Sequence, residues 1–455
     1  MRTRLTKHLC FARNHFKAVV PAFCCLLLAF ALFVAVSCSS AQQLAGAPQE
    51  EAAFANVNDR SLSADSSATQ LPSKLAGSVE TVDSNGIVHG TTPDGINYTV
   101  LGRGVDAAAA DKVTLCAVGD QLATSMSFPV AAQYAAEEGA GDYDFYPFYQ
   151  EIAPFIQSFD LRYINQETVM AGADAGYSGY PVFNSPDNMA ATIAKVGFNL
   201  VNFTTNHTYD MGLAGVERSH QVWDQYPQLL IGGSYLTQED RETVHMIERN
   251  GMTFAFLAYC YGDNNYGFGT DNMPNPYYAC QFDKGLMAQD IARAKKVADA
   301  VIVSMHWGDE YSNVPNSEQY DYAAFLADQG VDLVIGTHAH AVQPVKYITG
   351  ESGNTIPVVF GLSDIVSGWT ITDTIFSGIF TCEFTRGTDG KITVGNLDWY
   401  PTIEWSDGGD VYVRMLKDMD EATTDENTRT PDVGDDYNYL HNEIDTMGME
   451  IPVIM

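Results

Sequence analysis

Two histidines, His338 and His340, stand two residues apart directly after the largely apolar run 331–335. The run predicts a buried strand that Gly336 and Thr337 end, so both imidazoles follow the carboxyl end of that strand. Neutral imidazoles are good ligands for divalent ions such as Zn, Mn or Fe. If only these two histidines are considered, a hydrogen-bonded surface pair is the plainer interpretation. The polar residues at other strand ends must therefore decide between a surface pair and a metal site.

Other largely apolar runs also end in side chains that can bind a metal ion or transfer a proton. These runs cover residues 112–118, 162–164, 196–203 and 300–305. Each polar residue has a plain explanation by itself, as a turn residue, a helix cap or part of a solvated edge. Ligands of open α/β sheets bind at the carboxyl ends of the strands, however, and we expect the whole set to gather there. The set comprises Asp120, Glu167, Asn206, His207, His306, His338 and His340.

This combination of carboxylates, an amide and imidazoles predicts a site for one or two divalent ions, with Mn, Zn or Fe as candidates. Two ions in such sites lie about 3.5–4 Å apart and stabilise the attacking and leaving oxygens of a hydrolysis reaction. The pattern therefore favours a metal-dependent hydrolase.

The elements that must position these residues alternate between strands and helices. Further strands are predicted at residues 228–233, 252–259 and 357–362, helices at 285–298 and 319–329, and antiparallel β structure at 376–399. This order is typical of an α/β fold. Residues 259–282 are rich in Tyr, Asn and Gly and too irregular for an ordinary connection, which makes them a candidate lid or substrate loop.

Charge and composition divide the chain into five predicted regions. The net charge of −33 excludes nucleic acid as a partner that is bound through its phosphates. We predict an export signal or membrane anchor at 1–38, a disordered tether at 39–76, a small β segment at 77–111, the main domain at 112–405 and an acidic C-terminal tail at 406–455.

The first region has a basic start, an apolar run from 18 to 36, and small residues before Cys38. This pattern is typical of an export signal, and its end resembles the lipobox of bacterial lipoproteins, although Ala35 stands where Leu is usual. Cys38 would then be the lipidated amino terminus. An uncleaved anchor helix is the alternative, because the run is near the length that spans a bilayer. Both alternatives predict a protein at the extracytoplasmic face of the cell membrane.

The order of the motifs resembles that of the CapA family, the poly-γ-glutamate capsule biosynthesis proteins. The segments that carry the resemblance are Gly119-Asp120, Asn165-Gln166-Glu167, Asn206-His207 with Asp210, His306-Trp307-Gly308-Asp309-Glu310, and His338-Ala339-His340 with Gln343-Pro344. The fold of that family is similar to the calcineurin-like metallophosphoesterases. The resemblance implies an αββα sandwich and an association with a membrane-bound capsule synthesis machinery.

The resemblance also implies roles for the polar set in an exported, membrane-tethered metallohydrolase. Asp120 and His340 would hold one ion, and Glu167 would lie between that ion and a second. His207 would act near the substrate as an acid or charge stabiliser. The second ion would be held by Asn206, His306 and His338, and the predicted substrate contacts are Asn165, Trp307 and Glu310.

Three positions depart from the broader phosphoesterase pattern. That pattern has His two residues after the first Asp, where this chain has Leu122, and a bridging Asp where this chain has Glu167. The usual Leu-Gly-Asn-Phe of the family is Leu-Ser-Asp-Ile at 362–365. Two alternatives therefore stand beside the hydrolase: a non-catalytic component that binds or exports an anionic polymer, and a cell-surface phosphodiesterase or nucleotidase with a phosphoester substrate.

Overall fold

The computed structural model describes residues 74–104, 110–139, 141–369, 372–406, 408–429 and 448–455. They belong to one compact unit, Thr69–Met455. The predicted export segment with Cys38, and the predicted tether up to residue 73, lie outside the described residues. No helix within the described ranges is long and apolar enough to cross a membrane.

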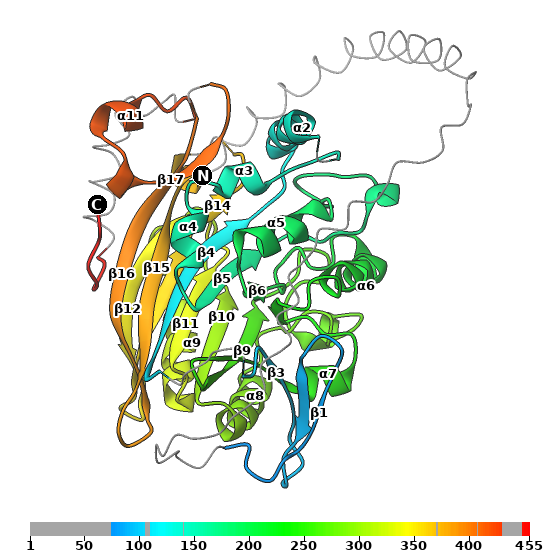
Figure 1. Ribbon diagram of the computed structural model, residues 1–455, viewed down its shortest axis with the longest axis vertical. Coiled ribbons are helices and arrows are strands. Elements are labelled where there is room, and N and C mark those ends of the chain that lie inside the picture. Colours follow the sequence, from blue (N-terminus) through cyan, green and yellow to red (C-terminus); the bar gives the residue numbers. More distant parts are fainter. Residues whose placement is uncertain (1–73, 105–109, 140, 370–371, 407, 430–447) are drawn as a thin grey trace, which may run out of the picture. The chain divides into compact units, whose positions relative to one another are not determined.

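Two β-sheets form the centre of this unit (Figure 1). The first sheet has the strand order β1 (Val79–Val82), β2 (Val88–Thr91), β3 (Asn97–Leu101), β8 (Val244–Arg249), β9 (Met252–Cys260), β10 (Ala300–His306), β11 (Leu333–Thr337), β13 (Thr355–Leu362) and β12 (Val342–Thr349). The second has the order β17 (Tyr412–Met415), β16 (Ile392–Trp405), β15 (Phe376–Arg386), β4 (Lys112–Gln121), β5 (Leu161–Gln166), β6 (Leu200–Asn202) and β7 (Leu230–Gly232), and β14 (Asp364–Val366) pairs with β4.

Helices cover the outer face of each sheet. Those packed on the first sheet are α8 (Lys284–Val297) and α9 (Ser317–Gln329). Those packed on the second sheet are α2 (Ser127–Glu138), α3 (Tyr146–Tyr149), α4 (Ala153–Gln157), α5 (Asn188–Val196) and α6 (Gly212–Trp223). The remaining α-helices of the described residues are the short α7 (Gln238–Glu242), α10 (Thr372–Ile375) and α11 (Glu421–Asp425). The layers follow the order helix, sheet, sheet, helix, which confirms the predicted αββα sandwich.

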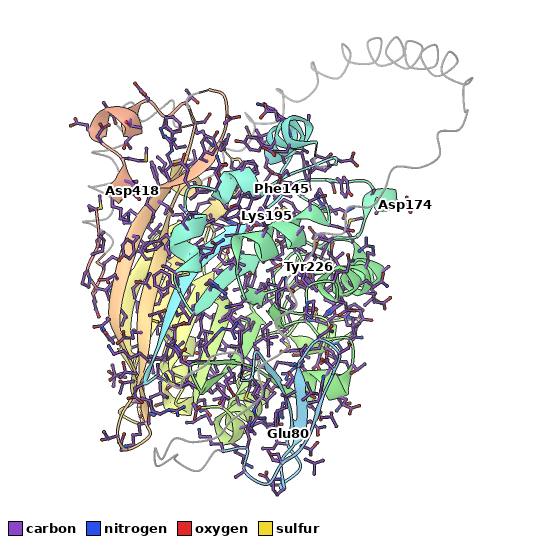
Figure 2. The ribbon with its side chains drawn as sticks, in the orientation of Figure 1. Glu80, Phe145, Asp174, Lys195, Tyr226 and Asp418 are labelled. Atoms are coloured by element: carbon purple, nitrogen blue, oxygen red, sulfur yellow. The ribbon has the colours of Figure 1, made fainter. Side chains whose placement is uncertain are left out.

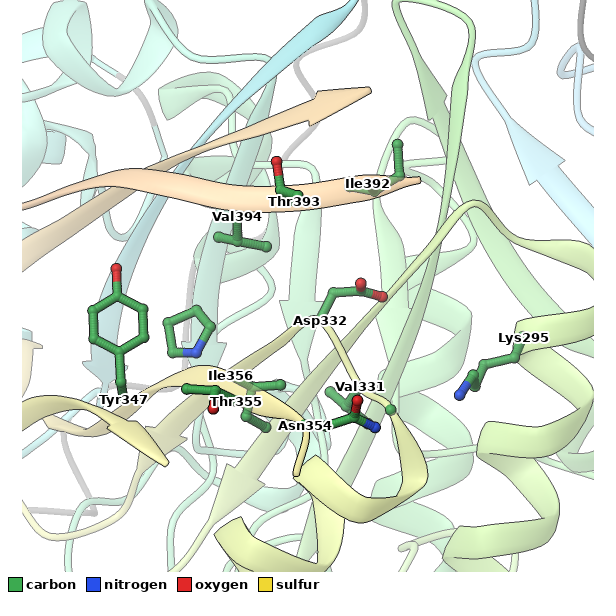
Figure 3. Close-up of a pocket in the computed structure, with 12 residues that line it drawn as sticks. Lys295, Val331, Asp332, Tyr347, Asn354, Thr355, Ile356, Ile392, Thr393 and Val394 are labelled. Carbon is green, nitrogen blue, oxygen red and sulfur yellow. The ribbon is translucent and has the colours of Figure 1, made fainter. Parts of the chain in front are cut away.

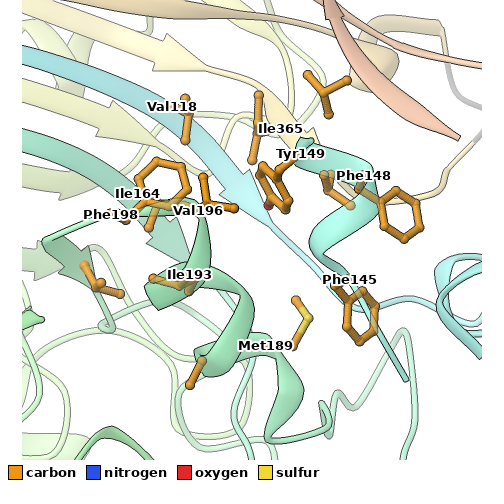
Figure 4. Packing of buried hydrophobic residues seen from close by; sticks show 14 of the residues in the cluster. Val118, Phe145, Phe148, Tyr149, Ile164, Met189, Ile193, Val196, Phe198 and Ile365 are labelled. Atoms are coloured by element: carbon orange, nitrogen blue, oxygen red, sulfur yellow. The ribbon is translucent and has the colours of Figure 1, made fainter. Parts of the chain in front are cut away.

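Alternation along the central strands explains why two sheets and two helical layers form. On β4, Leu115 and Ala117 contribute to the core between the sheets, whereas Cys116 and Val118 contribute to the core beneath the helices. Successive side chains of a strand point to opposite faces, so an apolar run supplies both cores. Figure 4 shows the outer core, in which Val118 packs with residues such as Ile193 of α5. Exposed positions, among them Lys195 of the same helix, carry polar side chains (Figure 2).

The two predicted flanking segments add strands to these sheets. Strands β1 to β3 extend the first sheet, because β3 pairs in parallel with β8. Part of the predicted acidic tail belongs to the second sheet, since β17 pairs with the end of β16, and Ile454 and Pro452 bond the backbone of Trp399. Its residues 430–447 lie outside the described ranges.

Close backbone approaches bring the polar residues together at one end of the sandwich. A Cβ at Gly119 would lie 1.8 Å from the Ser363 carbonyl oxygen, so only glycine lets β14 lie beside β4 with Asp364 opposite Asp120. At Gly336 a Cβ would lie 2.2 Å from the carbonyl oxygen of Phe360. These glycines fix the spacing of the strand ends that precede the site.

Candidate metal centre

The candidate metal centre lies where the carboxyl ends of strands from both sheets meet. Asp120 and Glu167 come from β4 and the end of β5, and His306 and His338 come from the ends of β10 and β11. A hydrogen bond joins the sheets here, because the His338 amide donates to Asp120 Oδ2 at 3.0 Å. All these side chains are at most 2% exposed.

One group of possible ligands is Asp120, His340 and Asp364, whose ligand atoms lie within 4.8 Å of one another. His340 Nδ1 is 2.7 Å from Asp364 Oδ1 and 3.6 Å from Asp120 Oδ2. Asn165 holds the other oxygen of Asp120 through an Nδ2 donation of 2.7 Å, and itself accepts from Asn202. The predicted substrate contact Asn165 therefore orients a carboxylate.

The second group is Glu167, His338 and His340, again within 4.8 Å. Glu167 Oε1 lies 3.6 Å from His340 Nε2 and 3.9 Å from His306 Nε2. His306 Nε2 is in turn 2.8 Å from Asn206 Oδ1, and its Nδ1 is 2.9 Å from the Thr337 hydroxyl. The structure thus brings all six predicted ligands into one cluster, with His340 shared by both groups.

Four buried atoms of this cluster test whether a cation fits. Both carboxylate oxygens of Glu167, Nδ1 of His338 and Oδ2 of Asp364 have no hydrogen-bond partner. A buried polar atom without a partner costs about 1–3 kcal/mol, and buried charges are normally paired or coordinate a metal. Carboxylate oxygens and imidazole nitrogens are also the donor types that Zn, Mn and Fe accept. The residues present therefore fit a divalent ion.

Burial, followed by interactions among the charged groups, shifts the pKa values of the cluster strongly. Burial raises the pKa of Asp120 to about 7 despite the nearby His340, and burial likewise raises that of Glu167 well above its usual value. Burial and neighbouring histidines lower the pKa values of His306 and His338, which keeps both imidazoles neutral. Burial acts to lower the pKa of His340 as well, but the surrounding carboxylates raise it well above 6.5. A bound divalent cation would favour ionised carboxylates and a neutral His340.

The backbone at the site adopts conformations that L-residues rarely occupy. His338 has φ 91°, His340 has φ 49° and Ser363, next to Asp364, has φ 60°. Such conformations cost of order 1–3 kcal/mol each and persist where the surrounding structure imposes them. This conformational free energy is spent at His338, at His340 and at the turn that precedes Asp364. Strained backbone at such residues is the pattern expected of a functional site.

His207 lies at the edge of the cluster. Its Nδ1 is 2.8 Å from Asp210 Oδ2, and its side chain is 6% exposed. Asp210 Oδ2 also accepts the backbone N–H of Phe183 at 2.7 Å, and the Phe183 ring meets the imidazole edge to face at 4.6 Å. Asn264 Nδ2 approaches His207 Nε2 at 3.3 Å. A carboxylate at Nδ1 fixes the tautomer and orientation of the ring, which suits proton transfer at Nε2.

The other two predicted substrate contacts differ in their surroundings. Trp307 is 1% exposed, packs on Phe360 and donates its indole N–H to the Phe360 carbonyl at 2.8 Å. This accounts for Trp307 as a core residue of the first sheet. Glu310 is exposed, and its charge contributes to the raised pKa of Glu167. Glu310 therefore lies at the opening of the site.

Asp364 is the residue that sequence reasoning missed as a ligand. The available signal was its place at the end of a predicted strand, where the family's usual asparagine becomes aspartate. Leu122, at the position of the absent histidine, is 1% exposed and contributes no donor atom. The carboxylate of Asp364, 2.7 Å from His340 Nδ1, adds an acidic group that the phosphoesterase pattern does not supply.

The predicted lid or substrate loop lies against the cluster. The Tyr261 ring lies 4.6 Å from that of His338, and the Asn264 amide donates to the Asn206 carbonyl at 2.9 Å. Tyr209 and Asn265 join the loop to the preceding His207 segment, with Asn265 Nδ2 donating to the Tyr209 carbonyl at 3.1 Å. The loop thus forms part of the wall of the site.

A separate cavity of about 450 Å³ lies near the starts of β11 and β13 of the first sheet and of β16 of the second (Figure 3). Asp332, which precedes β11, and Lys295 line it together with Tyr347 of β12. Since His338 follows the opposite end of β11, this cavity is distinct from the metal centre.

A four-layer sandwich with a buried histidine and carboxylate cluster at its strand ends is therefore the class of protein that the fold and site define. The family model described as bacterial capsule synthesis protein PGA_cap matches residues 101–368, more than half of the chain. The chain belongs to this family of capsule synthesis proteins, as its motifs predicted.

Named relatives agree with that membership. The chain is 25% identical over 269 residues to the PGA biosynthesis protein CapA of Bacillus subtilis, an alignment that covers 52% of this chain and 68% of the relative. It is 22% identical over 241 residues to the capsule biosynthesis protein CapA of Bacillus anthracis, with 51% and 56% covered. The chain thus spans little more than half of the latter.

Among solved structures, the NAD nucleotidase of Haemophilus influenzae is similar at 10% identity and a TM-score of 0.36, with 66% of this chain and 59% of that chain covered. The two sheets and the helices on their outer faces themselves define the sandwich.

Proposed function

We propose that this protein is a metal-dependent hydrolase that acts in capsule-polymer synthesis or export, tethered at the extracytoplasmic face of the cell membrane. The observation that carries the proposal is the buried cluster of three carboxylates and three histidines, in which four possible metal-ligand atoms have no hydrogen-bond partner. Family membership supports the link to capsule or polyglutamate synthesis. The basic start, the apolar run and Cys38 support export and a lipid or helical anchor.

Asp120, Asp364 and His340 would hold one ion, and Glu167 and His338 would hold a second that shares His340 or lies beside it. A bound ion supplies Lewis-acid activation of a water molecule and of the oxygen at the bond to be broken. His306 Nε2 lies 3.9 Å from Glu167 Oε1 and 2.8 Å from Asn206 Oδ1, so His306 and Asn206 would complete the ligand set.

The remaining side chains orient groups and move protons. His207 is placed to give a proton to a leaving oxygen or to stabilise its charge, since Asp210 holds Nδ1. Asn165 keeps Asp120 in position through its amide. Burial of the cluster excludes bulk water, which strengthens each electrostatic interaction within it.

Elemental analysis of the purified full chain tests the proposal, beside a variant with both His338→Ala and His340→Ala and a control His89→Ala. His89 is an exposed histidine of β2 whose Nε2 lies 3.1 Å from Asp83. We expect a stoichiometric divalent ion in the parent and the control and its loss in the double variant. Absence of bound metal after loading with Mn, Zn and Fe would overturn the proposal.

Turnover of phosphoester and γ-glutamyl substrates then tests catalysis. We expect hydrolysis that requires the added ion and that the double variant lacks. Metal binding without turnover of any substrate would favour the non-catalytic polymer-binding component, for which the absence of a histidine at Leu122 is the supporting observation.

A further inference from the structure

Exposed aromatic rings surround the opening of the metal centre. Tyr311 is 42% exposed, and its ring lies 5.9 Å from that of His340. Phe268 is 71% exposed and lies 5.9 Å from Tyr261, the ring that packs on His338. An exposed phenylalanine loses the free energy of burial, so such rings mark binding surfaces when they are grouped.

A third ring completes the group on the side of His207. Tyr180 is 72% exposed and lies 6.4 Å from Phe183, the ring that meets His207 at 4.6 Å. The phenol of Tyr180 is also close enough to Tyr311 to contribute to that residue's raised pKa of about 12, for which burial is the main cause. We call Tyr180, Phe268 and Tyr311 the aromatic rim.

The segments around the aromatic rim contain no lysine or arginine. Apart from the histidines, their charged residues are carboxylates, including Asp263, Asp309 and Glu310. Arg218 and Arg429 contact these segments from neighbouring elements, but they pair with Asp187 at 2.6 Å and Glu404 at 3.3 Å. The segments are 172–187, 204–212, 261–283, 307–316, 338–344 and 363–369.

This surface is a poor match for a polyanion. A polymer with a carboxylate on every residue would meet carboxylates and aromatic rings, and would find a cation only at the metal centre. A neutral polymer of sugar rings matches better, because the C–H face of a sugar ring is apolar and packs on an aromatic face. Its hydroxyls find hydrogen-bond partners in the exposed side chains of Asn264, Asn265 and Glu310.

We propose that the aromatic rim binds a neutral glycan chain, whose sugar rings pack on Tyr180, Phe268 and Tyr311 beside the metal centre. Binding of the glycan to these rings does not depend on the proposed function. Only cleavage of a phosphoester or γ-glutamyl bond attached to that glycan would rest on it.

Calorimetric titration of the full chain tests this inference, with neutral hexasaccharides of glucose, galactose and N-acetylglucosamine and with poly-γ-glutamate as probes. The variants are Phe268→Ala and Tyr180→Ala. Both native side chains are exposed, so we expect their removal to leave the fold intact. The matched control is Tyr347→Ala, because Tyr347 is 44% exposed on β12, outside the rim segments. We expect a neutral hexasaccharide to bind, each rim variant to raise its Kd about tenfold, and the control to leave the Kd unchanged.

Three results would overturn the inference: no binding of any neutral hexasaccharide, tighter binding of poly-γ-glutamate than of all of them, or rim variants that behave like the control. Repeating the titration in chelator separates this inference from the proposed function. Glycan binding in chelator would show that the rings bind the glycan without metal. A protein that binds the glycan but takes up no metal after loading would refute only the hydrolase. Metal-dependent turnover without glycan binding would refute only the inference about the aromatic rim.

Discussion

Replacing Glu167 with Gln should have opposite effects on the metal-free and the metal-bound protein. Both oxygens of Glu167 are buried without a hydrogen-bond partner, and burial raises its pKa well above the usual value. The ionised form is therefore disfavoured in the folded state. Its cost is absent below the unfolded carboxyl pKa of about 4.3, appears as the pH rises, and is complete above the raised folded pKa.

The magnitude follows from those two oxygens. Without metal, Glu167→Gln should be more stable than the parent by roughly 1–3 kcal/mol at pH 8, and the difference should vanish near pH 4. With metal, loss of one ligand that weakens affinity tenfold reduces the stabilisation at an ion concentration of 100 times the parent Kd from about 2.7 to about 1.4 kcal/mol.

Guanidinium unfolding in chelator and in the ion that the purified protein retains measures both effects. Glu351→Gln is the control, since Glu351 is exposed in the turn between β12 and β13 and should change stability by less than about 0.5 kcal/mol. A Gln variant that is less stable than the parent in chelator at pH 8, or that gains as much from the ion as the parent does, would refute the reasoning.

Three further variants probe other features. Asp210→Asn should lower kcat by roughly 10–100-fold with metal content unchanged, because His207 loses the carboxylate that orients it, and steady-state kinetics beside elemental analysis would show this. Trp307→Phe should lower the free energy of unfolding by about 1–3 kcal/mol through the lost hydrogen bond to Phe360, while KM stays unchanged; a raised KM would instead support the predicted substrate contact. Burial raises the pKa of Asp332 to about 6, so Asp332→Asn should stabilise the protein above pH 6 by up to about 3 kcal/mol and not below pH 4, as urea unfolding at several pH values can check.

The candidate metal centre combines side chains that suit an ion with a cost to folding. Its unpartnered atoms and positive φ angles at His338 and His340 each destabilise the metal-free protein. A bound ion would offset these costs, so folding stability and ion affinity should be linked. The protein should therefore unfold at a higher temperature when the ion is present.

Local sequence signals determined the layers and most of the site. Apolar runs such as 300–305 and 331–335 are buried strands because both faces of each sheet are covered, and a polar residue directly beyond such a run has to lie at the strand's end. The end of β10 also shows the alternation of successive side chains between the two faces of a strand. His306 faces the cluster, and Trp307, one residue on, faces the core beneath the helices.

Only the tertiary structure decided which of these residues are partners. Asp364 joins Asp120 and His340 because β14 pairs with β4, a contact between segments more than 200 residues apart that no local pattern encodes. The assignment of ligands to two overlapping groups likewise depends on the distance between two sheets, which share no backbone hydrogen bonds in the described strands. Sequence determines the residue types at each strand end, whereas the packing of one sheet on the other sets the distances between them.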